Sequence, residues 1–519
     1  MLTAGVRPRF FVAISFVAAT LALCAGVFAQ GSLESRIRGA LDKARLGKAS
    51  VGICVVDAST GRELVSISSE GQSGESLIPA SNLKLLTTGA ALVTVGPEFE
   101  FRTQFVVAGD QVFIEGAGDP ALADPELLAR MKTSVEQFLD RLADSIAGAG
   151  SAEIREVVLD DRIFDREFVH PMWPVDQLNR AYCAPVQGVN FHANILRVFP
   201  QPGGRAGDPP SVRTEPAAAW IEFDRQRART VREGSTQVWI EHGSNTFRYG
   251  LHGSVRNAPT EPVSVSVKDP AAVFARLLAD RIGTRLKCPS PTVRLAAADE
   301  PVGSSRSGAV VAAIVRTPIS VVLERCNVDS DNLYAESLLK LTGHEVTHQP
   351  GSWANGAAVV RMIVKDRIGA SHAASLTVSD GSGLSRANRV TPQLLAHWLA
   401  NMASDERVGD AYVRSLPIAK EEGTVKNRFK GKKLANEVRA KSGYIRQVRS
   451  LSGLVTAAGE SDSLVPGQEP PRRLAFSILV NDIPAGADQR AKELHENVVE
   501  VLDGYLTERA RVTASAGVR

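Results

Sequence analysis

The sequence predicts an α/β protein of the α+β kind, in which one domain is split by a long strand-rich insert. Residues 30–99 and 266–519 both mix helices with antiparallel strands. Residues 100–265 contain mostly short strands separated by Gly and Asp turns. Because the two ends resemble each other and the middle does not, we expect the ends to form one domain. A chain of 519 residues is also longer than a single core usually organises.

Residues 1–29 are predicted to be a secretory signal peptide. Two arginines precede an apolar run over residues 10–28, which closes with small and apolar residues at the cleavage positions. A lipoprotein signal needs a small residue before its cysteine, but Leu23 precedes Cys24. The pattern leaves an uncleaved membrane anchor open as the alternative. No later run is long and apolar enough to span a bilayer.

The charge and the remaining cysteines argue against two classes of protein. The chain has 60 Lys and Arg against 57 Asp and Glu, a net charge of +3, so we expect no nucleic acid partner. The cysteines lack the paired Cys-x-x-Cys spacing of a zinc site. Four cysteines allow three pairings, and the sequence does not choose among them. The four are Cys54, Cys183, Cys288 and Cys326.

The first part of the split domain is predicted as a helix, a hairpin and a second helix. Apolar residues at helical spacing indicate a helix over residues 32–46. Residues 49–68 alternate in two runs around an Asp and Gly turn, which is typical of a β-hairpin. The helix predicted over residues 78–93 is apolar on nearly every side, yet it contains a lysine near its start.

The insert and the second part are predicted from the same kinds of pattern. One amphipathic helix, over roughly residues 125–147, interrupts the strands of the insert, and the Pro-rich and Gly-rich residues 200–216 indicate a surface loop. Helices and strands return after the insert. We predict helices at residues 270–282, 319–326 and 332–341, strands at 437–458 and 473–481, and a closing helix at 485–509.

Ser81 and Lys84 form a candidate catalytic pair at the start of the apolar helix. Residues three apart lie on one helix face with about 5–6 Å between their Cβ atoms, so the amine can reach the hydroxyl. Serine is a poor nucleophile without a neighbouring base. Another Ser-x-x-Lys, from Ser337 to Lys340, shows that the pattern alone is weak. The apolar surroundings strengthen the first pair, because the helix offers a solvated lysine scarcely any exposed face.

Pro79 indicates where this helix begins. Proline suits the first helical position, so we expect Ser81 to lie in the first turn. Free backbone N–H groups and the positive end of the helix dipole would there stabilise a developing oxyanion.

Two further patterns follow in order along the chain. Ser-Asp-Asn at residues 330–332 precedes a predicted helix, and Lys-Ser-Gly at residues 441–443 lies in a predicted strand and is followed by Tyr444. Each pattern is common alone. The ordered set of three, with the first on a helix and the last on a strand, is much less common.

With these motifs the chain resembles the penicillin-recognising serine enzymes, whose Ser-x-x-Lys, Ser-x-Asn and Lys-Thr/Ser-Gly motifs line one cleft. It is most similar to the D-Ala-D-Ala carboxypeptidase/endopeptidase family, the class C low-molecular-mass penicillin-binding proteins of peptidase family S13. The resemblance implies a serine β-lactamase/transpeptidase-like domain split by an insert. Further stretches that resemble the family are residues 116–120, 160–164, 182–185, 330–336 and 380–386.

The resemblance implies a role for each motif residue. Ser81 would be the acylated nucleophile and Lys84 the base that takes its proton, although the identity of the base is disputed across the wider superfamily. Ser330 and Asn332 would relay protons and hold the substrate amide. Burial and a second ammonium nearby both lower the pKa of a lysine, which a lysine base requires.

The third motif would bind the substrate. Lys441 would supply positive charge for the substrate carboxylate, Ser442 a hydroxyl, and Gly443 completes the motif. The backbone N–H groups of Ser81 and Tyr444 would form the oxyanion hole. Many relatives have threonine where Ser442 stands and a small hydroxyl residue where Tyr444 stands, so the contacts of that tyrosine with substrate are open.

Two charged residues outside the motifs match positions that contact the peptide stem in some relatives. These are Asp160 and Arg386, and we expect them to bind substrate. Charges that stabilise the surface or a loop are the alternative.

A competing zinc pattern, His-Glu-x-x-His, stands at residues 344–348. We expect the preceding helix to end at Thr342 and Gly343, which leaves the pattern in extended chain. Histidines four apart would then be separated by about 13 Å at about 3.3 Å per residue. One zinc, at about 2.1 Å from each ligand, does not bridge that distance. We expect no metal and no organic cofactor.

The sequence therefore predicts a secreted, periplasmic or cell-wall-associated serine D-Ala-D-Ala carboxypeptidase or endopeptidase. Its partners would be the peptidoglycan stem peptide and, as covalent inhibitors, β-lactams. A non-catalytic wall-binding protein of the same fold and a β-lactamase are the alternatives.

Overall fold

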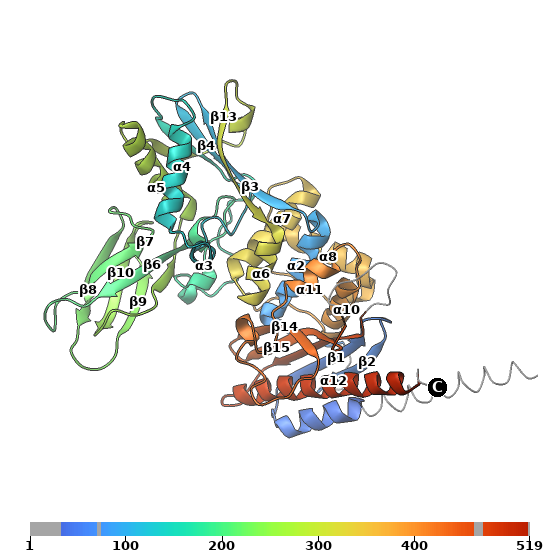
Figure 1. The fold of residues 1–519 in the computed structure, drawn as a ribbon. Coiled ribbons are helices and arrows are strands. Elements are labelled where there is room, and N and C mark those ends of the chain that lie inside the picture. The colour runs from blue at the N-terminus through green and yellow to red at the C-terminus, as the bar shows by residue number, and fades with distance from the viewer. Residues whose placement is uncertain (1–32, 70–73, 461–470, 517–519) are drawn as a thin grey trace, which may run out of the picture.

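The computed structural model describes residues 33–69, 74–460 and 471–516. The predicted signal peptide therefore lies outside the described residues. Figure 1 shows a main body, which holds both ends of the described chain, and an insert that extends away from it. The four sheets of the described residues divide between these two parts, one in the main body and three in the insert. The predicted α/β class with several sheets is confirmed.

The main body is built on a five-stranded antiparallel sheet in the order β14-β15-β16-β1-β2. The first and last thirds of the chain meet here, because β1 pairs with β16 over its whole length. All residues of β1 and β16 are buried, as expected for apolar strands that are covered on both faces. The strands are β1 (Ser50–Asp57), β2 (Glu63–Ser68), β14 (Glu437–Ile445), β15 (Val448–Thr456) and β16 (Arg473–Asn481).

Alternate side chains of β1 enter different cores. Val51 and Ile53 pack against a helix over residues 33–44 and the long helix α12 (Asp488–Ala516). These two helices lie side by side along the sheet, in blue and red (Figure 1), and Arg36 pairs with Glu508 between them.

The opposite face of the sheet carries the helical layer in which the site lies. Its core joins Val56 of β1 to the apolar sides of α2 and its neighbours. The helices are α2 (Lys84–Val95), α6 (Ile319–Val328), α7 (Asn332–Thr347), α8 (Trp353–Ile368), α9 (Ala370–Ala374), α10 (Pro392–Ala403) and α11 (Gly409–Arg414).

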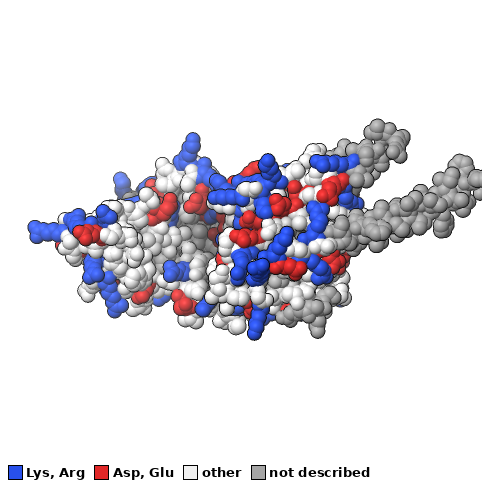
Figure 2. All heavy atoms as spheres, turned by 90° about the horizontal axis from the view of Figure 1, so that it is seen from below, with Lys and Arg blue, Asp and Glu red and all other residues white. Residues whose placement is uncertain are grey.

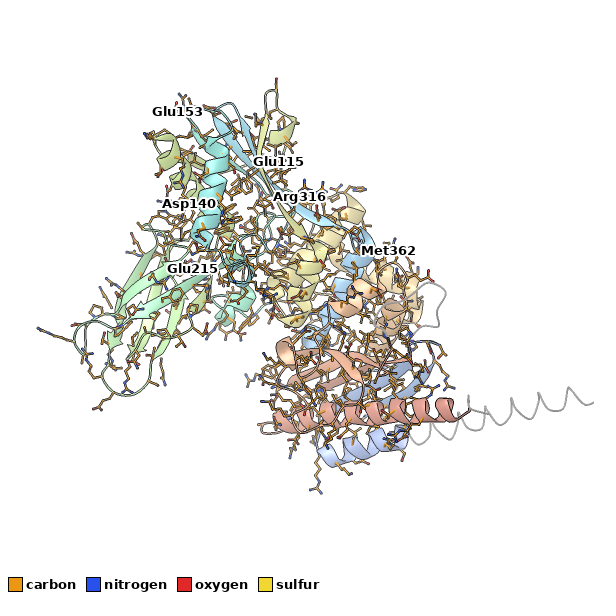
Figure 3. All side chains as sticks on the ribbon, in the orientation of Figure 1. Glu115, Asp140, Glu153, Glu215, Arg316 and Met362 are labelled. Carbon is orange, nitrogen blue, oxygen red and sulfur yellow. The ribbon has the colours of Figure 1, made fainter. Side chains whose placement is uncertain are left out.

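The first part of the insert is a second five-stranded sheet, in the order β12-β5-β4-β3-β13. One face packs against α4 and α5. Asp140 of α4 pairs with Arg281 and Arg285 of α5 across the helix contact (Figure 3). The elements are β3 (Glu100–Ala108), β4 (Gln111–Glu115), α3 (Pro125–Arg130), α4 (Val135–Ala147), β5 (Glu156–Asp160), α5 (Pro270–Leu286), β12 (Thr292–Leu295) and β13 (Val310–Pro318).

Strand pairing places the end of the insert later than the predicted boundary at residue 265. β13 pairs with β3 from Val310 to Pro318, and α5 packs in the core of the insert. Judged by these strand and helix contacts, the insert runs from about residue 100 to Pro318, and α6 begins at the next residue. Strand pairs between segments this far apart leave no periodic signal in the sequence.

The far end of the insert holds two three-stranded sheets, ordered β8-β10-β9 and β11-β6-β7. Their strands are β6 (Ile195–Gln201), β7 (Ser211–Glu215), β8 (Glu222–Thr230), β9 (Gln237–His242), β10 (Arg248–Val255) and β11 (Val263–Ser266).

Within the described ranges, no helix has the length and apolar character to cross a membrane. The four cysteines in these ranges are free thiols, so the structure makes none of the three pairings. The helix predicted to end near residue 341 instead continues to Thr347.

Candidate active site

Ser81 lies in a 3-10 turn, Ala80–Leu83, which leads directly into α2. Ser81 was expected in the first turn of the α-helix, and this prediction is wrong. The serine lies in the 3-10 turn that precedes α2, because α2 begins at Lys84. Ala80 before it has a φ of 46°, in the left-handed region that non-glycine residues rarely adopt. Two hydrogen bonds hold the chain just before this turn. Asn481 accepts one from Ile78 N and donates one to Ile78 O.

Two glycines allow other segments to approach the Ser81 turn closely. A Cβ atom on Gly443 of β14 would lie 2.9 Å from Ser81 N and 2.1 Å from Ser450 Oγ. A Cβ atom on Gly383, whose φ is 85°, would lie 1.9 Å from Ala80 O. Neither position has room for a side chain, so glycine is required on both sides of the serine.

The side chain of Lys84 is fully buried and contacts three oxygen atoms. Its Nζ lies 2.7 Å from Asn332 Oδ1, 3.0 Å from Ser382 O and 3.3 Å from Ser81 Oγ. The first two atoms are acceptors only. A neutral amine has two N–H donors and one lone pair, so donation to these acceptors leaves the lone pair for the Ser81 hydroxyl proton. The arrangement suits a general base.

Burial lowers the pKa of Lys84, because the charged amine loses its water shell. Cys326 and the carboxyl groups of Glu336, Asp331 and Asp380 act in the opposite direction and raise this pKa. The net direction is downward, which favours the neutral form that a base needs.

Asn332 joins the second motif to Lys84. It is the first residue of α7, and Asp331 before it caps the helix by accepting a hydrogen bond from Tyr334 N. Besides contacting Lys84, the Asn332 amide donates from Nδ2 to Tyr182 O at 2.8 Å. Tyr182 belongs to the insert, so this amide links the insert to the catalytic pair.

Ser330 lies on the loop before α7, half-buried, with a φ of 63°. In the ranges that the structure describes, no hydrogen bond joins its hydroxyl to Ser81 or Lys84. Two ion pairs of the buried Arg325 adjoin this loop. Arg325 pairs with Asp124 of the insert at 2.9 Å and with Asp329 beside Ser330.

Lys441 lies on β14, an edge strand whose outer side faces the Ser81 turn. Its side chain is fully buried, its Nζ donates to Ser442 O, and its carbonyl accepts from Asn82 Nδ2 at 2.7 Å. Burial, together with the charge of Lys84, lowers the pKa of Lys441 to about 7.

The two residues beside Gly443 differ in exposure. Ser442 donates from Oγ to Thr424 Oγ1 at 2.8 Å. Tyr444 is 57% exposed, and the guanidinium of Arg449 lies 3.8 Å from its ring centre. Thr424 has no motif around it, so sequence reasoning missed it.

A cleft of about 960 Å³ opens over Ser81 and Asn332. The insert forms one wall, and residues after Gly443 form the opposite one. Arg386 lies in the wall of the cleft and donates to Arg446 O at 2.8 Å. Met172, Gln177, Tyr182, Leu384 and Tyr444 also line the cleft.

Asp160 is not brought into this cleft. It ends β5, and Arg162 Nε donates to its Oδ1 at 2.8 Å. Asp160 is therefore not among the residues that line the cleft, and its pairing with Arg162 fits the loop-stabilising alternative. Asp160 and Arg162 are two positions apart in the sequence, which is close enough for a local ion pair.

Two buried carboxyl groups hold the loop that contacts Lys84. Glu336 accepts hydrogen bonds from the backbone N of Gly381 and Ser382, and burial raises its pKa to about 7. Asp380 accepts from Gly383 N and from Trp173 Nε1. Both residues lie in stretches that resemble the family, Asp380 at the start of residues 380–386 and Glu336 at the end of residues 330–336, but neither was predicted to be a site residue.

The second Ser-x-x-Lys is also buried but differs in its partners. Lys340 donates to Asp165 Oδ1 at 2.6 Å and lies 4.0 Å from the ring centre of Trp353. Ser337 makes its hydrogen bond with Asn190, at 3.5 Å. Because Lys340 is an ion-paired structural group, it offers no free base to a serine.

The zinc pattern lies partly on a helix, contrary to expectation. His344 is inside α7, while His348 is its C-cap and has a φ of 56°. His344 Nδ1 lies 2.9 Å from Gln349 O. Within the described ranges, no group of three or more His, Cys, Asp or Glu has the geometry to hold a metal ion.

Known proteins match this chain over nearly its whole length. The model of the D-Ala-D-Ala carboxypeptidase 3 (S13) family matches residues 33–504. The D-alanyl-D-alanine carboxypeptidase of Actinomadura sp. strain R39 is 29% identical over 472 residues, which cover 86% of this chain and 81% of the relative. DacB of Haemophilus influenzae, a D-alanyl-D-alanine carboxypeptidase, is 22% identical and covers 75% of this chain and 80% of its own length.

A solved structure has the same fold. The crystal structure of penicillin binding protein 4 (dacB) from Haemophilus influenzae matches with a TM-score of 0.68 and 20% sequence identity. The match covers 91% of this chain and 99% of that one.

Proposed function

Because this chain belongs to the D-Ala-D-Ala carboxypeptidase 3 (S13) family, we propose that it is a serine D-Ala-D-Ala carboxypeptidase acting on the stem peptides of peptidoglycan. One observation carries the assignment to Ser81. The Nζ of Lys84 contacts the Ser81 hydroxyl, and its two shorter contacts engage acceptors that leave a lone pair for the serine proton. Serine hydrolysis needs this activated hydroxyl.

Acylation begins at the carbonyl carbon between the two terminal D-alanines. The Ser81 oxygen attacks this carbon as Lys84 takes the hydroxyl proton, which forms a tetrahedral oxyanion. The backbone N–H groups of Ser81 and Tyr444 stabilise the negative charge. The C–N bond then breaks, the proton passes to the leaving amine through Ser330, and D-alanine departs from the acyl-enzyme.

Hydrolysis reverses the roles of the same groups. A water molecule gives a proton to Lys84 as its oxygen attacks the ester carbonyl. Collapse of the second tetrahedral intermediate breaks the bond to Ser81, and the serine oxygen regains a proton. Both steps use the same side chains, so no further acid or base is required.

Substrate recognition is assigned to Asn332 and Arg386 of the cleft wall and to Lys441 and Ser442, which are not among the residues that line the cleft. Lys441, when protonated, attracts the terminal carboxylate of the substrate, and Ser442 offers a hydroxyl to it. Asn332 holds the substrate amide, while Arg386 binds the stem at the mouth. A β-lactam presents the same acyl group and carboxylate, so it acylates Ser81. Cleavage of D-Ala cross-links uses the same chemistry and is a second activity of the site.

Peptidoglycan lies outside the cytoplasmic membrane, so the protein must be exported to reach it. We assign this export to residues 1–29, whose charge and apolar run are typical of a secretory signal. The protein is then periplasmic or cell-wall-associated.

The test uses the purified protein and a stem pentapeptide that ends in D-Ala-D-Ala. We expect release of free D-alanine and labelling by a fluorescent penicillin, both of which Ser81→Ala abolishes. Ser337→Ala, from the second Ser-x-x-Lys, is the matched control and should keep both. No D-alanine from pentapeptide or cross-linked muropeptide would favour a non-catalytic wall-binding protein, and rapid turnover of the penicillin would favour a β-lactamase.

A further inference from the structure

The three-stranded sheet β8-β10-β9 presents one of its faces to solvent. Its inner face, with Tyr249, Leu251 and Ile240, is buried in the core of the insert. The register places His252 of β10 between Arg227 of β8 and Trp239 of β9 on the outer face. Figure 1 shows this sheet at the end of the insert, at the left of the view and away from β14.

An aromatic platform stands on the outer face. The rings of Trp239 and His252 are stacked, parallel within 12° and with centroids 5.4 Å apart. His252 is buried beneath the platform, so the indole is its exposed member. Trp239 is nevertheless 46% exposed, although burial is the usual state of so large an apolar ring. Gly253 has a φ of 101°, and a Cβ atom there would lie 2.0 Å from Gln237 O and 3.2 Å from the Trp239 ring. The close approach of the β9 backbone therefore requires glycine at this position.

A hollow of about 850 Å³ adjoins the platform at His252, while Trp239 is not among the residues that line it. Two ion pairs lie in its walls. Arg248 lies 3.4 Å from Glu222, and His252 lies 3.1 Å from Glu241. The lining holds three arginines and three acidic residues, so their formal charges cancel. The six are Arg225, Arg227, Arg248, Glu222, Asp224 and Glu241.

Arg227 differs from the other arginines of the lining. In the ranges that the structure describes, its guanidinium has neither an ion pair nor a hydrogen bond, while Arg225 donates to Pro210 O. A planar group with five N–H donors is therefore directed to solvent beside the hollow. Figure 2 shows that Lys and Arg side chains project from this end of the molecule, at the left of the view.

We propose that this outer face binds a glycan strand of N-acetylated sugars. An exposed indole stacks on the apolar C–H face of a sugar ring. Paired carboxylates and guanidinium groups match neighbouring hydroxyls and acetamido groups, because each presents two hydrogen-bonding atoms in one plane. The balanced charge of the hollow favours a neutral, hydroxyl-rich ligand over a polyanion. That the glycan is the sugar backbone of peptidoglycan rests on the proposed function.

A second contact on the same polymer changes how the enzyme meets its substrate. Stem peptides are attached to the glycan, so binding at the sheet converts the meeting of cleft and stem into an intramolecular event at raised effective concentration. The cleft wall is joined to this sheet, since Asn179, between the cleft residues Gln177 and Tyr182, donates from Nδ2 to Ile240 O of β9 at 2.7 Å. One molecule would therefore engage the wall at two points.

Calorimetric titration with the hexamer of β-1,4-linked N-acetylglucosamine tests the proposal directly. We expect the full protein to bind the hexamer and Trp239→Ala to weaken binding at least about tenfold, a change that corresponds to about 1.4 kcal/mol. Trp239→Phe, which keeps an aromatic face, should retain most of the affinity. Arg155→Ala removes an exposed arginine elsewhere on the insert and should change nothing. No binding by the wild type, or equal binding by Trp239→Ala, overturns the proposal.

Two further measurements separate this site from the cleft. Ser81→Ala should bind the hexamer as the wild type does, and Trp239→Ala should release D-alanine normally from a free pentapeptide but more slowly from isolated sacculi. If no variant releases D-alanine yet the hexamer binds, the proposed function fails and the glycan site stands. Binding of polyphosphate in place of the hexamer, weakened by salt, would assign the face to an anionic polymer and refute the proposal.

Discussion

The Nζ of Lys84 lies 2.7 Å from Asn332 Oδ1, closer than the 3.3 Å that separates it from Ser81 Oγ. The first and second motifs, 248 residues apart, thus meet through one hydrogen bond. This bond holds the amine beside the serine and uses one of its protons. Five expectations follow from this geometry and its surroundings.

Substitution of Lys84 by methionine should slow acylation by penicillin by on the order of 10²–10⁴-fold, the usual contribution of a general base. Methionine has a similar length and suits the buried position, so the fold should be kept. Stopped-flow measurement of the acylation rate tests this expectation. Acylation at the wild-type rate would show that another group takes the proton of Ser81.

Asn332→Asp should move the acidic limb of the pH–rate profile to higher pH. A carboxylate in place of the amide would stabilise the ammonium form of Lys84 and raise its pKa. The neutral amine, which acts as base, then forms only at higher pH. The acylation rate as a function of pH measures the shift. Asn332→Ala lacks the charge and should slow acylation without an upward shift.

The charge of Lys441 should make carboxypeptidase activity fall as pH rises through about 7. Below this pH the amine is protonated and attracts the substrate carboxylate, and above it the charge is lost. The decline belongs to the free enzyme, so kcat/KM should show it more clearly than kcat. A substrate with a C-terminal amide is the control and should lack this alkaline limb. An equal decline for both substrates would exclude this role for Lys441.

Gly443→Ala should abolish most penicillin acylation and lower stability by about 1–3 kcal/mol, the usual cost of overpacking. The new methyl group would meet Ser450 Oγ and Ser81 N. Gly39→Ala is the matched control, because no atom lies within 4 Å of a Cβ there. Urea unfolding and the acylation rate measure both effects. Wild-type acylation by Gly443→Ala would contradict the tight approach of β14 to the serine.

The buried pair Asp124–Arg325 should support the loop that carries Ser330. Asp124→Ala leaves the Arg325 charge buried without this partner, which typically costs about 3–5 kcal/mol. Glu324→Ala, which breaks an exposed pair with Arg130, should cost no more than about 1 kcal/mol. Thermal or urea unfolding distinguishes the two. Similar losses in both variants would place the loop's support elsewhere.

Local patterns in the sequence were sufficient for most single elements. The apolar alternation of residues 49–68 predicted the hairpin of β1 and β2. The single helix predicted over residues 125–147 is two helices in the structure, α3 and α4. The end of α7 was missed, because Thr342 and Gly343 indicate a cap and yet the helix continues. Packing of Gly343 against α8, where a Cβ would meet Gly356 N at 2.6 Å, overrides its weak helix propensity.

The sequence by itself determined the three motifs, their order, and the division of the chain into two similar ends around a strand-rich middle. Only the tertiary structure decided that Asn332 and Ser382 flank Lys84, that Asp160 lies away from the cleft, and that the insert closes at Pro318. The physical reason is the range of the interactions. Helix and strand patterns arise from neighbours a few residues apart, whereas these contacts join segments separated by up to about 300 residues.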